Sequence, residues 1–203
     1  MKFCAALVAG GRSSRMAQDK AFLDWHGRPL WRVQLEKLVS LTPEKILIAA
    51  RAEQGFAALL SREPDDAAII CVNDPAGEDC GPIGAITRCL KLSDRPLLVL
   101  AVDMPLMSTE FLREKLLSAA TETTGVVFRG RNGYEALAAV YVPAVVPFFD
   151  AALAAGRFAL QPLLTEIAGA GLCDTLETQP DEEAHFSNAN TPSEAARLLG
   201  FQF

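Results

Sequence analysis

The sequence has few of the residues that build disulfide frameworks or zinc sites. Its five cysteines are odd in number and include no CxxC pair. Its two histidines, His26 and His185, are far apart and have no cysteine or histidine at ligand spacing. This composition argues against a zinc site and favours reduced, mostly buried thiols.

Long apolar runs and positive charge are also scarce. The apolar run at residues 3–9 is too short for a signal-peptide core or a membrane span, and glycines follow it. The formal net charge of -6 argues against a diffuse nucleic-acid-binding surface, so a polyanionic substrate needs a local basic pocket. We therefore expect a cytoplasmic protein that binds neither membrane nor nucleic acid.

What the sequence does contain is a regular alternation of short apolar runs and amphipathic stretches. This rhythm predicts an α/β fold with a mostly parallel sheet, and the length of 203 residues fits one domain. The turn Gly130-Arg131-Asn132-Gly133 separates two of the later strands. The predicted strands are 3–9, 45–49, 68–72, 96–102, 125–128, 136–142 and 172–175, and the predicted helices are 30–41, 53–61, 82–92, 109–121, 143–155, 160–168 and 192–199.

A glycine pair with a basic loop directly follows the first predicted strand, where open parallel sheets bind ligands. The stretch from Val8 to Lys20 reads VAGGRSSRMAQDK. Glycines let backbone N–H groups approach phosphate oxygens, while an arginine fork and a lysine neutralise charge. The spacing is neither a Walker loop nor GxGxxG, so ATPase and dinucleotide-binding interpretations lose their main support. The alternative is a flexible surface turn with solvated charges.

A single aspartate, Asp103, is the first charged residue after the apolar run 96–102. Magnesium takes only one or two protein carboxylates and completes its octahedron with water and substrate phosphates. Asp103 therefore suffices as a metal ligand in this position. The alternative is a turn-forming or helix-capping aspartate before Pro105.

Two further polar loops are candidate parts of the same site. Asp74 follows a predicted strand and precedes a helix start of small residues, 81–85, which permits close approach of a ligand. The Asp74 carboxylate could accept a hydrogen bond from a ribose hydroxyl or a base amine. The alternative is that Asp74 is an ordinary loop residue before proline. Asn190 precedes a capping box formed by Thr191 and Glu194, and is either a neutral ligand near the metal or a structural amide.

Together, these segments resemble the molybdenum cofactor guanylyltransferases, in the nucleotidyltransferase superfamily with a glycosyltransferase-A-like sheet. The resemblance rests on AGGRSSRM with Lys20 after it, WHGRPL, GPIGA, VDMP and NANTP, in this order over nearly the whole chain. It implies a three-layer α/β/α, Rossmann-like nucleotidyltransferase fold whose mostly parallel open sheet contains an antiparallel strand. It also implies one domain, 1–203, with a nucleotide-binding half, 1–108, and an acceptor-side half, 109–203.

The resemblance implies Mg²⁺-dependent transfer of GMP from GTP to the phosphate of molybdopterin, with release of pyrophosphate. Mg²⁺ is then the cofactor, bound by Asp103, and the partners are the two small substrates, with room for transient contacts to other cofactor-biosynthesis proteins. Catalysis is assigned to Lys20, Arg15 and Asp103. The implied nucleotide-binding residues are Val8, Ala9, Gly10, Gly11, Lys20, Asp74, Asp103 and Asn190.

The glycine pair favours GTP, because the related cytidylyltransferases tend to carry Ala-Ala-Gly. The chain departs from the family pattern at Ala17, at the order Gly84-Ala85, and at Ala50, where a nucleotide-binding asparagine is expected. Three alternatives remain: cytidylyl transfer to molybdopterin, nucleotidyl transfer to a sugar phosphate or isoprenoid precursor, and a degenerate nucleotide- or cofactor-binding module without activity.

Overall fold

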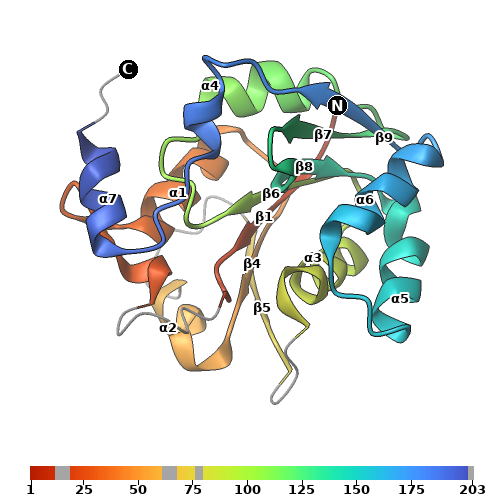
Figure 1. Ribbon diagram of the computed structural model, residues 1–203. Coiled ribbons are helices and arrows are strands. Elements are labelled where there is room, and N and C mark those ends of the chain that lie inside the picture. Colours follow the sequence, from red (N-terminus) through yellow and green to blue (C-terminus); the bar gives the residue numbers. More distant parts are fainter. Residues whose placement is uncertain (12–18, 61–67, 76–79, 201–203) are drawn as a thin grey trace.

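A seven-stranded, mostly parallel sheet forms the centre of the protein in the computed structural model, which describes residues 1–11, 19–60, 68–75 and 80–200 (Figure 1). The strand order is β5-β4-β1-β6-β8-β7-β9, and β8 runs antiparallel to both neighbours. The mostly parallel open sheet with an antiparallel strand is therefore confirmed. The strands are β1 Cys4–Val8, β4 Ile46–Ala50, β5 Ile69–Asn73, β6 Leu97–Ala101, β7 Gly125–Gly130, β8 Gly133–Tyr141 and β9 Cys173–Glu177, and a separate hairpin pairs β2 Asp24–Trp25 with β3 Arg28–Pro29.

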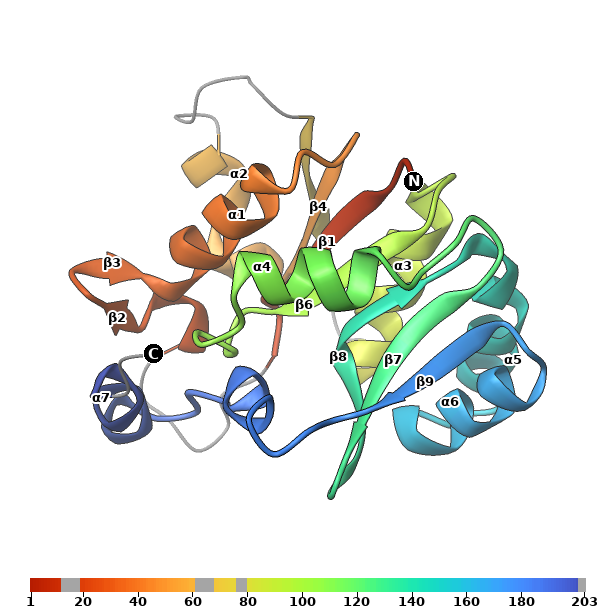
Figure 2. The ribbon, with the colours of Figure 1, turned by 90° about the horizontal axis from the view of Figure 1, so that it is seen from above.

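Helices cover both faces of this sheet, which confirms the predicted three-layer arrangement (Figures 1 and 2). One layer contains α1 Leu30–Ser40, α2 Phe56–Leu60, α4 Thr109–Phe111, which continues as a π-helical segment Leu112–Leu117, and α7 Pro192–Leu199. The other layer contains α3 Gly81–Leu92, α5 Val146–Ala154 and α6 Leu160–Gly169. Short 3₁₀ turns lie at Lys20–Phe22, Ala52–Gln54, Pro143–Val145 and Glu183–Phe186. Within the described residues, no helix is both long and apolar enough to cross a membrane.

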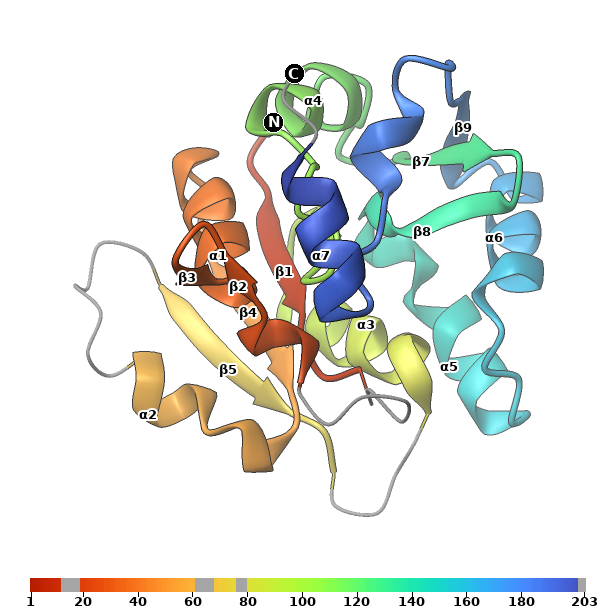
Figure 3. The same ribbon diagram turned by 60° about the vertical axis from the view of Figure 1, so that its left-hand side comes forward.

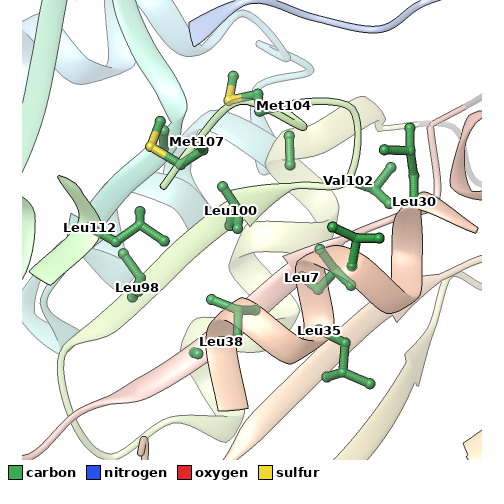
Figure 4. Packing of buried hydrophobic residues seen from close by; sticks show 14 of the residues in the cluster. Leu7, Leu30, Leu35, Leu38, Leu98, Leu100, Val102, Met104, Met107 and Leu112 are labelled. Carbon is green, nitrogen blue, oxygen red and sulfur yellow. The ribbon is translucent and has the colours of Figure 1, made fainter. Parts of the chain in front are cut away.

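The central strands β1, β4 and β6 are buried along their whole length, because they have hydrogen-bonded neighbours on both sides and helices on both faces. Successive side chains point to opposite faces, so Leu7 joins the core under α1 while Ala6 joins the core under α3. Figure 4 shows the first of these cores, in which side chains from β1, β6 and α1 interdigitate with Val102, Met104 and Met107 of the loop after β6. This packing fixes the course of the chain around Asp103.

The segment before α1 forms a small hairpin, where the sequence predicted only a loop leading into the helix. His26 and Gly27 have φ angles of 53° and 78°, as a two-residue hairpin turn requires. Two-residue strands are too short to give an alternation signal in the sequence. Trp25 and Trp31 are both buried and belong to the hydrophobic core.

Two predicted helices differ from the observed ones. The helix predicted at 53–61 is divided, because Gly55 adopts a φ of 70° and ends the turn Ala52–Gln54 before α2 begins at Phe56. The helix predicted at 109–121 ends earlier, since its π-helical part stops at Leu117. The other predicted elements are present, with their ends shifted by a few residues.

The C-terminal segment returns to the edge of the sheet where β1 and β6 end. Helix α7 lies against the β2–β3 hairpin, as Figures 2 and 3 show from two directions. The Ala189 N–H donates to the carbonyl of Asp103 at 2.7 Å. The C-terminal segment therefore contacts both the β2–β3 hairpin and the loop that carries Asp103.

Candidate active site

A cleft of about 800 Å³ opens at the carboxyl ends of β1, β4, β5 and β6. Its walls are the loops after these strands, the start of α3, and Lys20. This is the edge at which open parallel sheets bind ligands. Seven of the residues singled out in the sequence line it: Val8, Ala9, Gly10, Gly11, Lys20, Asp74 and Asp103.

The Lys20 ammonium group lies between two side chains from distant parts of the chain. Its Nζ donates to Asp103 Oδ2 at 3.0 Å and to Asn190 Oδ1 at 2.5 Å. The Lys20 and Asp103 side chains are 24% and 17% exposed, so the pair remains accessible from the cleft. Because an ammonium group has three N–H donors, the third is available to a ligand.

Two side chains of α1 fix the loop that carries Asp103. The fully buried Gln34 donates through Nε2 to the carbonyls of Ala101, at 3.2 Å, and Met104, at 2.7 Å. One turn further on, Lys37 donates to the carbonyl of Pro105 at 2.7 Å, and burial lowers the pKa of Lys37 to about 8. The carbonyls around Asp103 thus have donors from a helix in the core.

Asn190 is held by the capping arrangement at the start of α7. The Glu194 N–H donates to Thr191 Oγ1 at 3.0 Å, as the sequence predicted for this helix start. The Glu194 carboxylate accepts from the backbone N–H of Asn190, at 2.8 Å, one residue before the N-cap. Together with the Ala189–Asp103 hydrogen bond, this contact sets the Asn190 amide beside Lys20.

The donor set at this position suits a divalent cation that prefers oxygen ligands. The Asp103 carboxylate and the Asn190 amide oxygen already converge on one positive charge, the Lys20 ammonium. Within the described residues, no group of three or more histidine, cysteine, aspartate or glutamate side chains is arranged to hold a metal. Magnesium fits such a sparse site, because water and substrate phosphates supply most of its ligands.

On another wall of the cleft, Asp74 forms an ion pair with Arg88 of α3. Its carboxylate lies above Gly10, where a Cβ would be 2.9 Å from Oδ2. A Cβ at Gly84, one helical turn before Arg88, would lie 3.2 Å from Nη1 of that arginine. The order Gly84-Ala85 therefore makes room for the guanidinium group, while Ala85 lines the cleft.

Three residues singled out in the sequence remain: Ala17 and Ala50, which depart from the family pattern, and the predicted catalytic residue Arg15. Arg15 and Ala17 lie outside the described residues. Ala50 is fully buried within β4, so its side chain packs in the core, and the adjacent Arg51 lines the cleft instead.

Sequence reasoning missed Arg51, Gln54 and Arg88. Arg51 had a usable signal, because it directly follows a predicted strand on the ligand-binding edge. Arg88 had none, since its pairing with Asp74 depends on how α3 is placed against β5.

Comparisons with known proteins show the family of the chain. Residues 5–184 match the family model of the MobA-like NTP transferase domain. A molybdenum cofactor guanylyltransferase from Xanthomonas euvesicatoria pv. vesicatoria is 33% identical over 198 residues, which cover 95% of this chain and 92% of that protein. The structure of molybdopterin-guanine dinucleotide biosynthesis protein A from Archaeoglobus fulgidus has a TM-score of 0.74 and 21% identity over 96% of both chains. A nucleotidyl transferase from Methanothermobacter has a TM-score of 0.75 and 20% identity over 97% of this chain and 95% of its own.

The fold and these similarities define a nucleotidyltransferase. The chain belongs to the MobA-like NTP transferase family.

Proposed function

We propose that the protein transfers GMP from GTP to the terminal phosphate of molybdopterin, with Mg²⁺ bound and pyrophosphate released. The observation that carries the proposal is the position of the Lys20 ammonium group, which binds both Asp103 and Asn190. Lys20 and Asp103 line the cleft together with Gly10 and Gly11. The 33% identical relative, which is named as a molybdenum cofactor guanylyltransferase, supports the choice of substrates.

In this reaction, a phosphate oxygen of the acceptor attacks the α-phosphorus of GTP. The bond from the α-phosphorus to the bridging oxygen breaks, and its electron pair leaves with pyrophosphate. Such transfers need positioning and charge neutralisation more than a protein nucleophile. The third N–H of Lys20 would donate to a phosphate oxygen while the group keeps its contact with Asp103.

Asp103 and Asn190 are the residues that would hold Mg²⁺, through one carboxylate and one amide oxygen. When bound, the ion supplies Lewis-acid neutralisation of the triphosphate charge. Asn190 keeps its position through Glu194, and Asp103 keeps its position through the donors on α1, so the two oxygens are preorganised.

Asp74 and Lys20 both line the cleft, and we assign the nucleoside to the side of Asp74 and the phosphates to the side of Lys20. Asp74 follows β5 and Asp103 follows β6, and these strands are three steps apart in the sheet. At a spacing of about 4.8 Å per strand, this is a separation of about 14 Å between the strand ends. The Asp74 carboxylate is an acceptor for the N–H groups of guanine or for a ribose hydroxyl.

Pyrophosphate release tests the proposal directly. Purified protein with Mg²⁺ and molybdopterin should release pyrophosphate with GTP, and Asp103→Ala should abolish this while thermal unfolding stays cooperative. Turnover with CTP alone would indicate cytidylyl transfer. Turnover with sugar 1-phosphates would indicate that the acceptor is a sugar phosphate rather than molybdopterin. Tight GTP binding without turnover on any acceptor would indicate a binding module.

A further inference from the structure

We propose that Arg51, with Gln54, is a positioning residue that orients the glycine turn for phosphate binding and acts through the backbone rather than through its own charge. The inference rests on the proposed function, because it concerns the same triphosphate. It also assigns a role to the loop after β4, the strand that ends with the buried Ala50 in place of the expected asparagine.

The side chains of Arg51 and Gln54 bind every backbone carbonyl of the turn Ala9-Gly10-Gly11. Arg51 Nη1 donates to the carbonyls of Gly10, at 2.9 Å, and Gly11, at 2.8 Å. Gln54 Nε2 donates to the carbonyl of Ala9 at 2.9 Å. Three successive peptide units therefore have their oxygens directed toward the β4 loop.

The orientation of the carbonyls determines where the N–H groups of the turn point. In a trans peptide, the N–H is directed opposite to the carbonyl of the same planar unit. The N–H groups of Gly10 and Gly11 consequently point away from Arg51 and Gln54. Within the described residues, neither N–H has a hydrogen-bond partner, and both glycines line the cleft. Two adjacent backbone donors of this kind form a concave anion site.

The same two side chains also bind Asp19, which directly precedes Lys20. Arg51 Nη2 and Gln54 Nε2 donate to Asp19 Oδ2 at 2.7 and 2.8 Å. The other carboxylate oxygen, Oδ1, accepts from the N–H of Ala21 at 3.0 Å and starts the turn that carries Lys20. Arg51 and Gln54 therefore bind both the glycine turn and the residue directly before Lys20.

The charge of Arg51 is already neutralised by neighbouring carboxylates. Besides Asp19, its Nε donates to Glu53 Oε1 at 2.9 Å. The Arg51 side chain is only 18% exposed, whereas Glu53 is 71% exposed. A guanidinium group paired with two carboxylates adds little net attraction for a triphosphate, so its geometry is the useful property.

Binding of the Mg²⁺ complexes of GTP, CTP and inorganic tripolyphosphate, measured by titration calorimetry, tests this role. Arg51→Met should weaken binding of each ligand that the wild type binds by roughly 10- to 100-fold, the loss expected when charge-assisted hydrogen bonds are removed. The factor should be the same for all three, because the turn contacts phosphates rather than a base. Arg51→Lys should not restore binding, since an ammonium group cannot reproduce the fork.

Asp19→Asn separates a geometric role from an electrostatic one by the sign of its effect. If Arg51 served as a phosphate-binding cation, removing the Asp19 charge would free it and tighten triphosphate binding. The positioning role predicts weaker binding. The matched control is Lys91→Met on α3, which removes a cation paired with Asp150 at 2.7 Å outside the cleft, and it should leave binding unchanged.

Three results would each overturn the positioning role while leaving nucleotidyl transfer intact. They are wild-type affinity in Arg51→Lys, tighter binding by Asp19→Asn, and wild-type affinity in Arg51→Met. A wild type that binds none of the three ligands would overturn both. If Arg51→Met fails to fold, Gln54→Ala replaces it. The expected loss is at least about threefold, because the Gln54 amide donates to the Ala9 carbonyl and to the charged Asp19 carboxylate. Unchanged binding by a folded Gln54→Ala would equally overturn the proposal.

Discussion

The Asp74 carboxylate occupies the space that a side chain at residue 10 would need. A Cβ at Gly10 would lie 2.9 Å from Asp74 Oδ2, whereas a Cβ at Gly11 would meet no atom of the described residues within 4 Å. The two glycines of the turn are therefore not equivalent. A side chain at residue 10 would displace the Asp74 carboxylate, while one at residue 11 would displace none of the described residues.

Alanine substitutions at these two positions should consequently differ. Gly10→Ala forces the Asp74 carboxylate to move and disturbs its pair with Arg88, so we expect the Kd for GTP to rise about tenfold, the equivalent of one hydrogen bond to a charged group. Gly11→Ala should change the Kd less than about twofold. Equal effects of the two substitutions in a calorimetric titration would contradict this relationship.

Lys20 should matter most for the chemical step. Lys20→Met removes the ammonium group held by Asp103 and Asn190, and we expect the single-turnover rate to fall at least about 100-fold, as when one transition-state donor is removed. Lys2→Met, which removes an exposed cation paired with Glu44, is the control for charge alone. A Lys20→Met rate within tenfold of the wild type would exclude this role.

Gln34 should contribute to both stability and activity, because it is fully buried and donates to two carbonyls beside Asp103. Gln34→Met keeps a similar shape but leaves these carbonyls without their donor. We expect the free energy of unfolding to fall by about 1–3 kcal/mol in urea titrations, with a lower kcat. An unchanged midpoint and an unchanged kcat would show that the loop does not depend on this residue.

Lys37 should make stability depend on pH in a defined window. Its pKa is lowered from 10.5 to about 8, so between these values the unfolded chain holds a proton that the folded protein has released. The free energy of unfolding must then rise with pH from about 8 to 10.5, relative to a chain without this group. As the pH rises through that window, the wild type should therefore become more stable relative to Lys37→Met. A constant difference would contradict the burial of a charged Lys37 below pH 8.

The sequence was sufficient to predict the sheet and its edge, but not the contacts between loops. Strands such as β1 and β6 are continuous apolar runs, and the first polar residues after them lie at the carboxyl ends by geometry alone. This is why Gly10, Lys20, Asp74 and Asp103 could be assigned to one cleft. The hairpin formed by β2 and β3 was missed because two-residue strands carry no periodicity.

The supporting residues were harder to predict because their roles depend on distances between separate elements. The sequence Arg-Ala-Glu-Gln after β4 does not predict that Arg51 donates to the carbonyls of Gly10 and Gly11. Likewise, Gln34 appears in the sequence as one polar residue on an amphipathic helix. Only the packing of α1 over β6 reveals that it binds the loop around Asp103.

The dependence of GTP binding on Mg²⁺ tests the central claim most directly, namely that Asp103 and the glycine turn together bind a metal–triphosphate pair. Calorimetric titrations with and without Mg²⁺ should show at least about tenfold tighter GTP binding by the wild type when the ion is present. Asp103→Asn should bind GTP with the same affinity under both conditions. A variant that keeps the full Mg²⁺ effect would contradict the account, because the ion would then be held elsewhere.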